Sequence, residues 1–169
     1  MDMAVKAGAA CVMTAASAWG GKMLAGMQER RADMLRELLG AVRRLNIEML
    51  EKRMPVREAM EACGGLFSQT AGQMEGGAPP GAAFEKAAQA LRERGEMLDC
   101  LEEGDMAALH RLFAGLGSGG IQAQRLVLNE AAEELERLAG QARRKREEQG
   151  KLYTSLGALG GLALSLLLL

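Results

Sequence analysis

Two stretches of the chain carry apolar residues at alternating intervals of three and four. In a helix with about 3.6 residues per turn, such positions fall on one face, while the polar residues between them face outward. The sequence therefore predicts two long amphipathic helices, and antiparallel pairing of their apolar stripes would build a core. The first stripe consists of Leu35, Leu38, Val42, Leu45 and Met49, and the second of Ile121, Leu128, Ala131, Leu135, Leu138 and Ala142.

Proline and glycine divide the chain between these stripes into shorter helices. Pro55 cannot continue a helix but is well tolerated in a first turn, so we expect a second helix to start there. Gly64 and Gly65 end or kink that helix, and residues 72–81 form a loop. A third helix then covers residues 84–98. A fourth covers residues 101–117, with Asp105 as its N-cap, and the segment 116–120 breaks it. No strand-like alternation occurs, so the predicted fold class is all-α: a membrane-anchored helical bundle.

The end of the chain is its most apolar part. Residues 152–169 carry no charge, and as a helix they would extend about 27 Å, close to the ~30 Å hydrocarbon core of a bilayer. We predict a C-terminal transmembrane helix there, with a buried core helix as the alternative. Basic residues beside a span favour the cytoplasmic side, and an aromatic residue suits the interface. The predicted membrane junction comprises Arg143, Arg144, Lys145, Arg146, Lys151 and Tyr153.

A second, weaker apolar stretch covers residues 4–27, flanked by Lys6 and Lys22. We interpret it as an uncleaved membrane anchor. The alternatives are a secretory signal with small residues at 16–18 as its cleavage site, and a soluble or interfacial helix. The predicted organisation is an N-terminal anchor (1–27), a cytoplasmic helical platform domain (28–151) and a C-terminal transmembrane helix (152–169).

Composition excludes several kinds of function. The chain of 169 residues has a formal net charge of −1 and offers no strongly basic face for nucleic acid. Its three cysteines are scattered and suit neither a disulfide framework nor a zinc site. His110 has no ligand-spaced partners, so we expect it on a helix surface or in a loop. The pairs Glu102–Glu103 and Glu133–Glu134 look like solvated surface. We therefore expect no enzyme activity, no metal and no cofactor, and a role in binding.

Three segments together resemble the stage III sporulation protein AB family of endospore-forming Firmicutes. The first is the junction KLYTSLGALGG at residues 151–161, which runs into the leucine-rich end. The second combines Leu45 and Ile47–Glu48 with the run Pro55–Met60, and the third is Leu116–Gly117 followed by Gln124. The segments occur in the family's order over nearly the whole chain. One position departs from the family pattern: Gly120 stands where the family has an Asp that would cap the next helix.

The resemblance implies a role that the residues alone do not. The family belongs to a secretion-like channel complex between mother cell and forespore, and its soluble domain resembles the platform domain of type II secretion and type IV pilus machines. It implies a non-enzymatic subunit in the mother-cell membrane around the forespore, with its middle domain cytoplasmic. The implied partners are the complex's cytoplasmic ATPase, stage III sporulation protein AA, the other membrane subunits and membrane lipid. We expect the docking residues on polar faces, near Glu48, Arg57, Glu58 and Gln124.

Two alternatives stay open at this point. One is a platform component of a type II secretion or type IV pilus system outside sporulation. The other is a tail-anchored structural adaptor that forms a homo-oligomer through the apolar stripe at residues 121–142.

Overall fold

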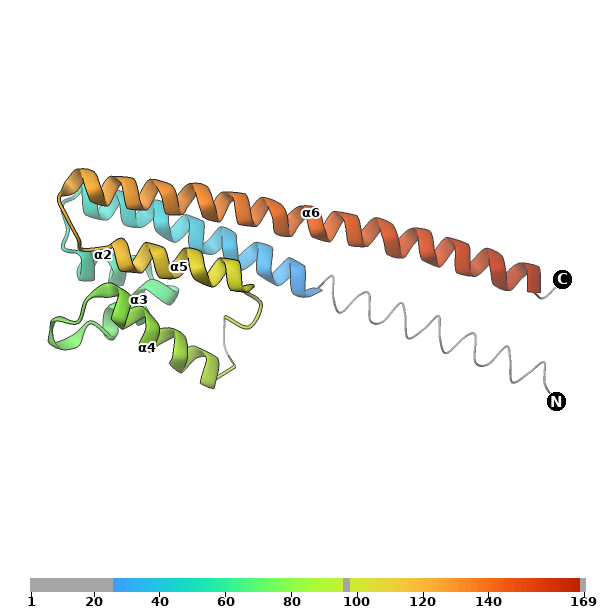
Figure 1. Ribbon diagram of the computed structural model, residues 1–169, viewed down its shortest axis with the longest axis horizontal. Coiled ribbons are helices and arrows are strands. Elements are labelled where there is room, and N and C mark those ends of the chain that lie inside the picture. Colours follow the sequence, from blue (N-terminus) through green and yellow to red (C-terminus); the bar gives the residue numbers. More distant parts are fainter. Residues whose placement is uncertain (1–25, 96–97, 168–169) are drawn as a thin grey trace. The chain divides into compact units, whose positions relative to one another are not determined.

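The computed structural model describes residues 26–95 and 98–167, with side chains up to residue 148. No strand occurs in these residues, which confirms the all-α class (Figure 1). Two compact units divide the chain: Arg31–Gly140 forms one, and Met1–Arg30 with Gln141–Leu169 forms the other. The described elements are a helix over residues 26–46, the π-helix η1 (Ile47–Glu51), α2 (Val56–Cys63), α3 (Gly65–Gly72), the 3₁₀-helix η2 (Glu75–Gly77), α4 (Pro80–Glu93), α5 (Glu103–Gly115) and α6 (Ile121–Leu167).

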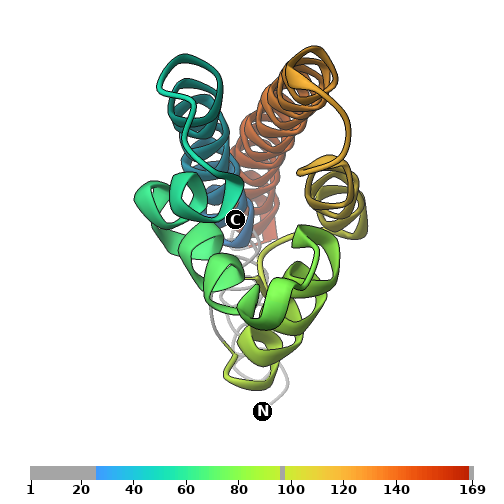
Figure 2. The ribbon, with the colours of Figure 1, turned by 90° about the vertical axis from the view of Figure 1, so that its left-hand side faces the viewer.

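The two predicted long helices are present and run antiparallel. Within the unit Arg31–Gly140, Asn46 Nδ2 donates to Asn129 Oδ1 at 3.3 Å, and Arg43 Nη2 lies 3.1 Å from Glu136 Oε2. As the residue number increases along helix 26–46, the number of the contacting residue on α6 decreases, so the two helices run antiparallel. Both views show these two helices side by side (Figures 1 and 2). The predicted antiparallel pairing is confirmed.

Most of the predicted stripe residues are buried. Leu35, Val42, Leu45 and Leu128 are fully shielded from solvent. The prediction is wrong at both ends, because Met49 is only half-buried and Ile121 is 59% exposed. Met49 lies in η1, where the wider π-helical turn shifts the face that a side chain occupies. Ile121 is the first residue of α6 and precedes the part of that helix that packs on the core.

The shorter helices supply the aromatic part of the core. Helix α3 packs against α2 and α4, and α4 packs against α5. All three phenylalanines of the chain meet where these helices converge. The rings of Phe84 and Phe113 stack at a centroid distance of 4.5 Å, and Phe67 lies 5.1 Å from Phe113. Contacts of this kind add about 0.5–1.5 kcal/mol per pair beyond the burial of apolar area.

The helix boundaries correct the sequence predictions in two places. Helix α2 follows Pro55 and ends before Gly64, whose φ of +74° separates it from α3, as predicted. Helix α4 starts at Pro80, four residues before the expected start, since proline suits a first turn. It ends at Glu93 rather than at Leu98, and Gly95 follows with a φ of +64°.

The second correction concerns the start of α5. Asp105 is not the N-cap. Glu102 is the N-cap, and Asp105, the third residue of the helix, completes a capping box with it. Its Oδ2 accepts a hydrogen bond from the backbone amide of Glu102 at 2.9 Å. The carboxylate therefore caps α5 from inside the first turn rather than from the residue before it.

The terminal predictions fall largely outside the described residues. Residues 1–25 of the predicted N-terminal anchor lie outside them. The predicted C-terminal span has helical backbone up to Leu167, but its side chains lie outside the description. In the part of the chain that the structure describes, no helix has both the length and the apolarity needed to cross a membrane. The anchor and span therefore stay predictions.

Candidate docking site at one end of the bundle

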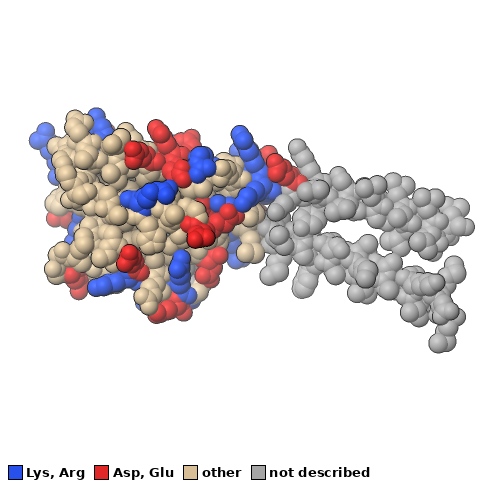
Figure 3. Space-filling view, viewed as in Figure 1, with Lys and Arg blue, Asp and Glu red and all other residues tan. Residues whose placement is uncertain are grey.

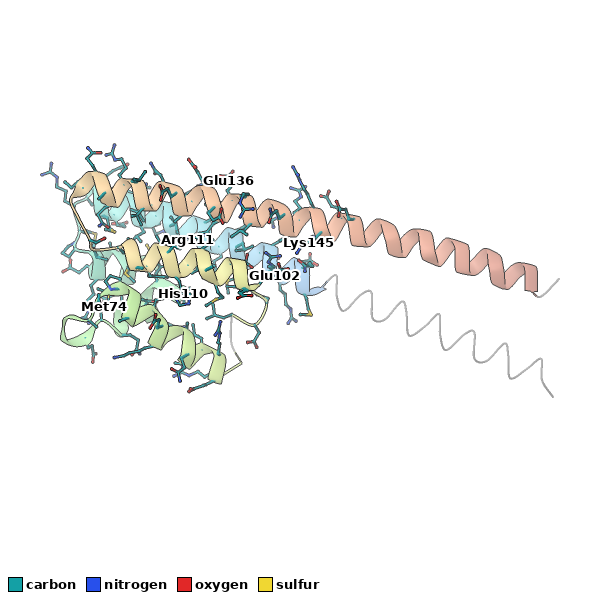
Figure 4. All side chains as sticks on the ribbon, in the orientation of Figure 1. Met74, Glu102, His110, Arg111, Glu136 and Lys145 are labelled. Carbon is teal, nitrogen blue, oxygen red and sulfur yellow. The ribbon has the colours of Figure 1, made fainter. Side chains whose placement is uncertain are left out.

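Two of the three segments that carry the family resemblance meet in space. The first turn of α2 and the turn between α5 and α6 are about 60 residues apart in sequence, yet they line one open groove of about 600 Å³. The loop between α3 and α4 forms its third wall, and Met74 on this loop is labelled in Figure 4. The groove is lined by Val56, Arg57, Met74, Gly77, Ala78, Pro79, Pro80, Ala114, Leu116, Gly117 and Ser118.

The side chains that line the groove are apolar except at Arg57 and Ser118. Among the described residues that form it, Arg57 alone is charged. Its Nε lies 3.2 Å from Glu61 Oε1 one helical turn further along α2, and both side chains are about half exposed, at 48% and 50%. An exposed pair at this spacing contributes only about 0.3–0.5 kcal/mol. The guanidinium of Arg57 is therefore held weakly and can exchange its partner at little cost.

Gln124 does not line the groove, but it holds the α5–α6 turn that does. We expected docking residues on polar faces, but Gln124 is only 7% exposed. Its Oε1 accepts the Gly117 amide at 3.2 Å, and its Nε2 donates to the Ser118 carbonyl. These bonds hold the α5–α6 turn, in which Gly117 and Gly119 have φ values near +78°. The Asp cap of the family pattern is absent at Gly120, and the Gln124 side chain bonds the backbone of the turn rather than the first amides of α6.

Glu48 and Glu58 occupy different environments near this end. Glu58 lies exposed in the first turn of α2, where the helix dipole stabilises a negative charge. Glu48 lies in η1 with a side chain only 13% exposed, and it accepts from Lys52 Nζ at 2.8 Å. The structure thus brings Arg57 and Glu58 together on an accessible surface, while Glu48 and Gln124 are held within their own local contacts.

The backbone that leads into α2 is strained. Arg53 has a φ of +56°, the one positive value at a non-glycine residue in the described part of the chain. Beside it, the Met54 amide donates to the Glu48 carbonyl, six residues earlier, at 3.0 Å. A left-handed conformation costs about 1–2 kcal/mol for a residue with a side chain. Such strain and π-helical turns are both frequent at functional sites.

A buried ionic cluster lies at the N-terminus of α5 and was not predicted from the sequence. Arg31, 3% exposed, makes a bidentate contact with fully buried Asp105, with Nε–Oδ2 at 2.7 Å and Nη2–Oδ1 at 2.8 Å. Its Nη1 also lies 2.6 Å from Glu102 Oε1, and Glu102 is labelled at this end of α5 in Figure 4. The hydrogen bonds to Asp105 raise the pKa of Arg31. Arg31 lies one turn before Leu35, so it continues the buried stripe of helix 26–46.

The predicted membrane junction carries both signs of charge. Arg143 Nε lies 3.1 Å from Glu147 Oε1, and Arg146 Nη2 lies 2.9 Å from Glu29 Oε1. Arg144 and Lys145 are exposed, and the side chains of Lys151 and Tyr153 lie outside the description. Acidic and basic residues also alternate over the face shown in Figure 3.

The structure gives no sign of catalytic or metal chemistry in its described part. No group of three His, Cys, Asp or Glu side chains there could hold a metal ion. His110 is exposed and packs edge-on against Phe84 at 4.9 Å, which confirms its predicted place on a helix surface. Cys63 and Cys100 are partly buried thiols, and burial raises the pKa of the Cys63 thiol to about 11.

Comparison with known proteins agrees with the resemblance seen in the sequence. The family model described as stage III sporulation protein AB matches residues 6–169, which is nearly the whole chain. No curated protein and no solved structure matches the chain. The match to a sporulation family disfavours the alternative of a platform component in a secretion or pilus system outside sporulation.

Proposed function

The chain belongs to the stage III sporulation protein AB family, and we propose that it is a non-enzymatic platform subunit of the channel complex between mother cell and forespore. In this role the helical domain docks the cytoplasmic ATPase, stage III sporulation protein AA. Its terminal segments couple that ATPase to the other membrane subunits of the complex. The protein would lie in the mother-cell membrane around the forespore, with its middle domain on the cytoplasmic side, where ATP is present.

The observation that carries this proposal is the meeting of two family-like segments at one groove. A platform needs an accessible surface for its partner, and the groove that Arg57 lines provides one, with Glu58 exposed in the same turn of α2. The turn that lines the groove leads directly into α6, and α6 continues as one helix to Leu167. This continuity supports a role in which the docking surface is coupled to the predicted C-terminal span.

The alternative of self-association through the stripe at residues 121–142 is disfavoured. Leu128, Leu135 and Ala142 are buried within the chain itself, so they are not available to a second copy. Ile121 and Leu126 on this helix are each 59% exposed, but Ile121 precedes the part of α6 that packs on the core, and Leu126 lies off the buried face. A homo-oligomer would therefore need a different surface.

Co-purification tests the proposed docking directly. Full-length protein in mild detergent is mixed with the purified ATPase, and the complex is isolated through a tag on either partner. We expect the wild-type protein to retain the ATPase. A variant that combines Arg57→Glu with Glu58→Arg conserves net charge and should lose the ATPase with unchanged helix content by circular dichroism.

A matched variant separates docking from a general charge effect. Arg92→Glu with Glu93→Arg makes the same inversion at adjacent exposed residues near the end of α4, away from the groove. This variant should retain the ATPase. If wild-type protein fails to bind the ATPase under conditions in which both proteins are folded, the proposed docking is wrong.

The side on which the domain lies needs its own experiment. A cysteine introduced at exposed Gln69, in a chain without its native cysteines, reports access to a membrane-impermeant maleimide. The variant is produced in non-sporulating cells, where it lies in the cell membrane that faces the medium, and labelling of wall-stripped cells only after permeabilisation would support the cytoplasmic placement. Labelling of intact cells would overturn it, and the domain would then be an extracytoplasmic adaptor.

A further inference from the structure

We propose that the groove between α2, the α3–α4 loop and the α5–α6 turn holds a segment of the ATPase with apolar anchor side chains and a neighbouring carboxylate that pairs with Arg57. This inference rests on the proposed docking of the ATPase and names the chemistry of the contact.

The composition of the groove favours a protein segment over a small molecule. Its volume of about 600 Å³ is within the range of ligand clefts, roughly 300–1,000 Å³. Small-molecule sites, however, add several convergent polar groups that fix the orientation of the ligand. Here the Ser118 hydroxyl already donates to the Gly115 carbonyl at 2.8 Å, and Arg57 is the one charged side chain among the described lining residues. Apolar walls with a charge at the edge suit apolar anchors of a protein partner.

The charge at the edge selects an acidic partner. The guanidinium of Arg57 is planar and always charged, and it binds a carboxylate through two parallel hydrogen bonds. Its present contact with Glu61 is a single one of 3.2 Å through Nε. A carboxylate next to the anchor side chains would offer both oxygens to Arg57 in a site that the anchors shield from water, so it competes well with Glu61.

The walls of the groove are already fixed in place. Gln124 bonds the Gly117 amide and the Ser118 carbonyl, and Pro79 and Pro80 restrict the backbone of the opposite wall. A Cβ atom at Gly115 would lie only 2.9 Å from both methyl groups of Val127, so the end of α5 sits close against α6. Binding therefore requires little ordering of the groove, and less of the contact energy is lost to entropy.

Two groove variants and one control test the proposal on the full-length chain. Arg57→Glu reverses the charge, and Ala78→Trp fills the groove from a half-buried position with extended backbone. Arg36→Glu is the matched control: Arg36 is 52% exposed and pairs with Asp33 three residues away, much as Arg57 pairs with Glu61, but it does not line the groove. The measurement is the Kd for the purified ATPase in detergent, with self-association of each variant recorded in parallel.

We expect each groove variant to raise the Kd at least about tenfold, because Arg57→Glu places a like charge opposite the partner's carboxylate and Ala78→Trp blocks the pocket for the anchor side chains. Arg36→Glu should change it less than about twofold. Should Ala78→Trp lose helix content, the exposed Arg57→Glu substitution decides alone.

The remaining outcomes separate the two proposals. If the ATPase binds wild-type and groove variants equally, the groove is not its site, while the docking itself stands. If the ATPase does not bind wild-type protein, both proposals are overturned. If Ala78→Trp instead abolishes self-association and leaves ATPase binding intact, the occupant is a second copy of the chain, and the segment proposed here is wrong.

A charge-reversal rescue identifies the carboxylate. Acidic residues of the ATPase are changed to Lys one at a time and tested against Arg57→Glu. One of these changes should restore at least about tenfold of the lost affinity, and it should weaken binding to the wild-type chain. If none does so, the ion pair with Arg57 is excluded.

Discussion

At the scale of single residues, the contact between Arg31 and Asp105 has the greatest consequence for stability. Both side chains are shielded from water, so their charges rely on contacts within the cluster in place of solvent. Removal of Asp105 leaves the buried Arg31 charge with the partly exposed Glu102 alone, and loss of one partner of a buried pair costs about 3–5 kcal/mol. Asp105 also caps α5, so its loss removes a second contribution.

Asp105→Ala should therefore lower the free energy of unfolding by about 3–5 kcal/mol. The double variant Arg31→Met with Asp105→Leu should recover most of this loss, because apolar side chains of similar size do not leave an unpaired charge. The missing cap should still cost about 1 kcal/mol. Urea denaturation of the full-length protein, followed by circular dichroism, measures both values. If the double variant is less stable than Asp105→Ala, the cluster stabilises through more than charge pairing.

Cys63 illustrates how burial changes the chemistry of one side chain. Its pKa is raised to about 11, mainly by desolvation, with Glu48 raising it further and Arg44 lowering it. Since the thiolate is the reactive form, only a very small fraction of Cys63 is reactive at neutral pH.

Maleimide should label Cys63 roughly tenfold to a hundredfold more slowly at pH 7.5 than an exposed thiol, whose pKa is about 8.5. The rate should rise about tenfold per pH unit and level off only near pH 11. The comparison uses Cys63 as the sole cysteine and, separately, Gln69→Cys in a chain without native cysteines, with mass spectrometry as the readout. Equal rates at pH 7.5 would show that Cys63 is not desolvated in solution.

The sequence pattern could have predicted one member of the buried ion pair but not the other. Arg31 lies four residues before Leu35, so it continues the apolar stripe and could have been identified as a buried charge. Its partner could not, because Asp105 is 74 residues away and its pairing depends on how α5 packs. The positive φ at Arg53 could not be predicted from the sequence, since arginine has no preference for this backbone conformation.

At the scale of helices, α5 packs closely against both α4 and α6. A Cβ atom at Gly81 in α4 would lie 3.2 Å from the Cα of Ala114, and one at Gly115 would lie 2.9 Å from Cγ1 and Cγ2 of Val127 in α6. Glycine is needed at residue 115 for space, whereas a positive φ explains Gly117 in the following turn. The same short stretch therefore needs glycine for two different reasons.

Gly115→Ala should reduce stability by about 1–3 kcal/mol through overpacking. Val127 is β-branched and has few rotamers in a helix, and both of its methyl groups are equally close, so rotation gives no relief. Gly140→Ala is the control, because a Cβ atom there meets nothing within 4 Å, and it should gain up to about 1 kcal/mol. Thermal and urea unfolding provide the values. Adding Val127→Ala should rescue Gly115→Ala, and a failure to rescue would place the clash elsewhere.

The bounds of α2 were predicted well because residues with special backbone chemistry mark them, whereas the start of α4 was missed although Pro80 marks it. Pro55 and Gly64 bracket α2 as expected. The end of helix 26–46 was not predictable in the same way, because η1 replaces the last α-helical turns and moves Met49 off the core face. A change from α to π geometry depends on local packing and leaves the residue pattern unchanged.

At the scale of the whole molecule, periodicity predicted the elements but not the surface that they form together. Complementary apolar stripes were enough to predict that helix 26–46 pairs with α6. The groove, in contrast, depends on three connections, each folded by local hydrogen bonds and glycine conformations. The resemblance named segments on two of its walls without indicating that they meet, since that meeting follows from the order of packing of α2 to α5.

The pairing of the two long helices yields a test of the fold in solution. In a chain whose three native cysteines are replaced by Ala, Asn46→Cys and Asn129→Cys should be joined by a short bismaleimide, because their side chains are in contact at 3.3 Å. The product should be a monomer with altered mobility on a denaturing gel. Arg36→Cys with Asn129→Cys is the control, since ten residues of helix displace the site by about 15 Å. A crosslinked dimer from the first pair would mean that the helix facing α6 comes from a second copy. Equal crosslinking of both pairs would mean that the two helices lack a fixed register, and in either case the groove as described would not exist in the isolated chain.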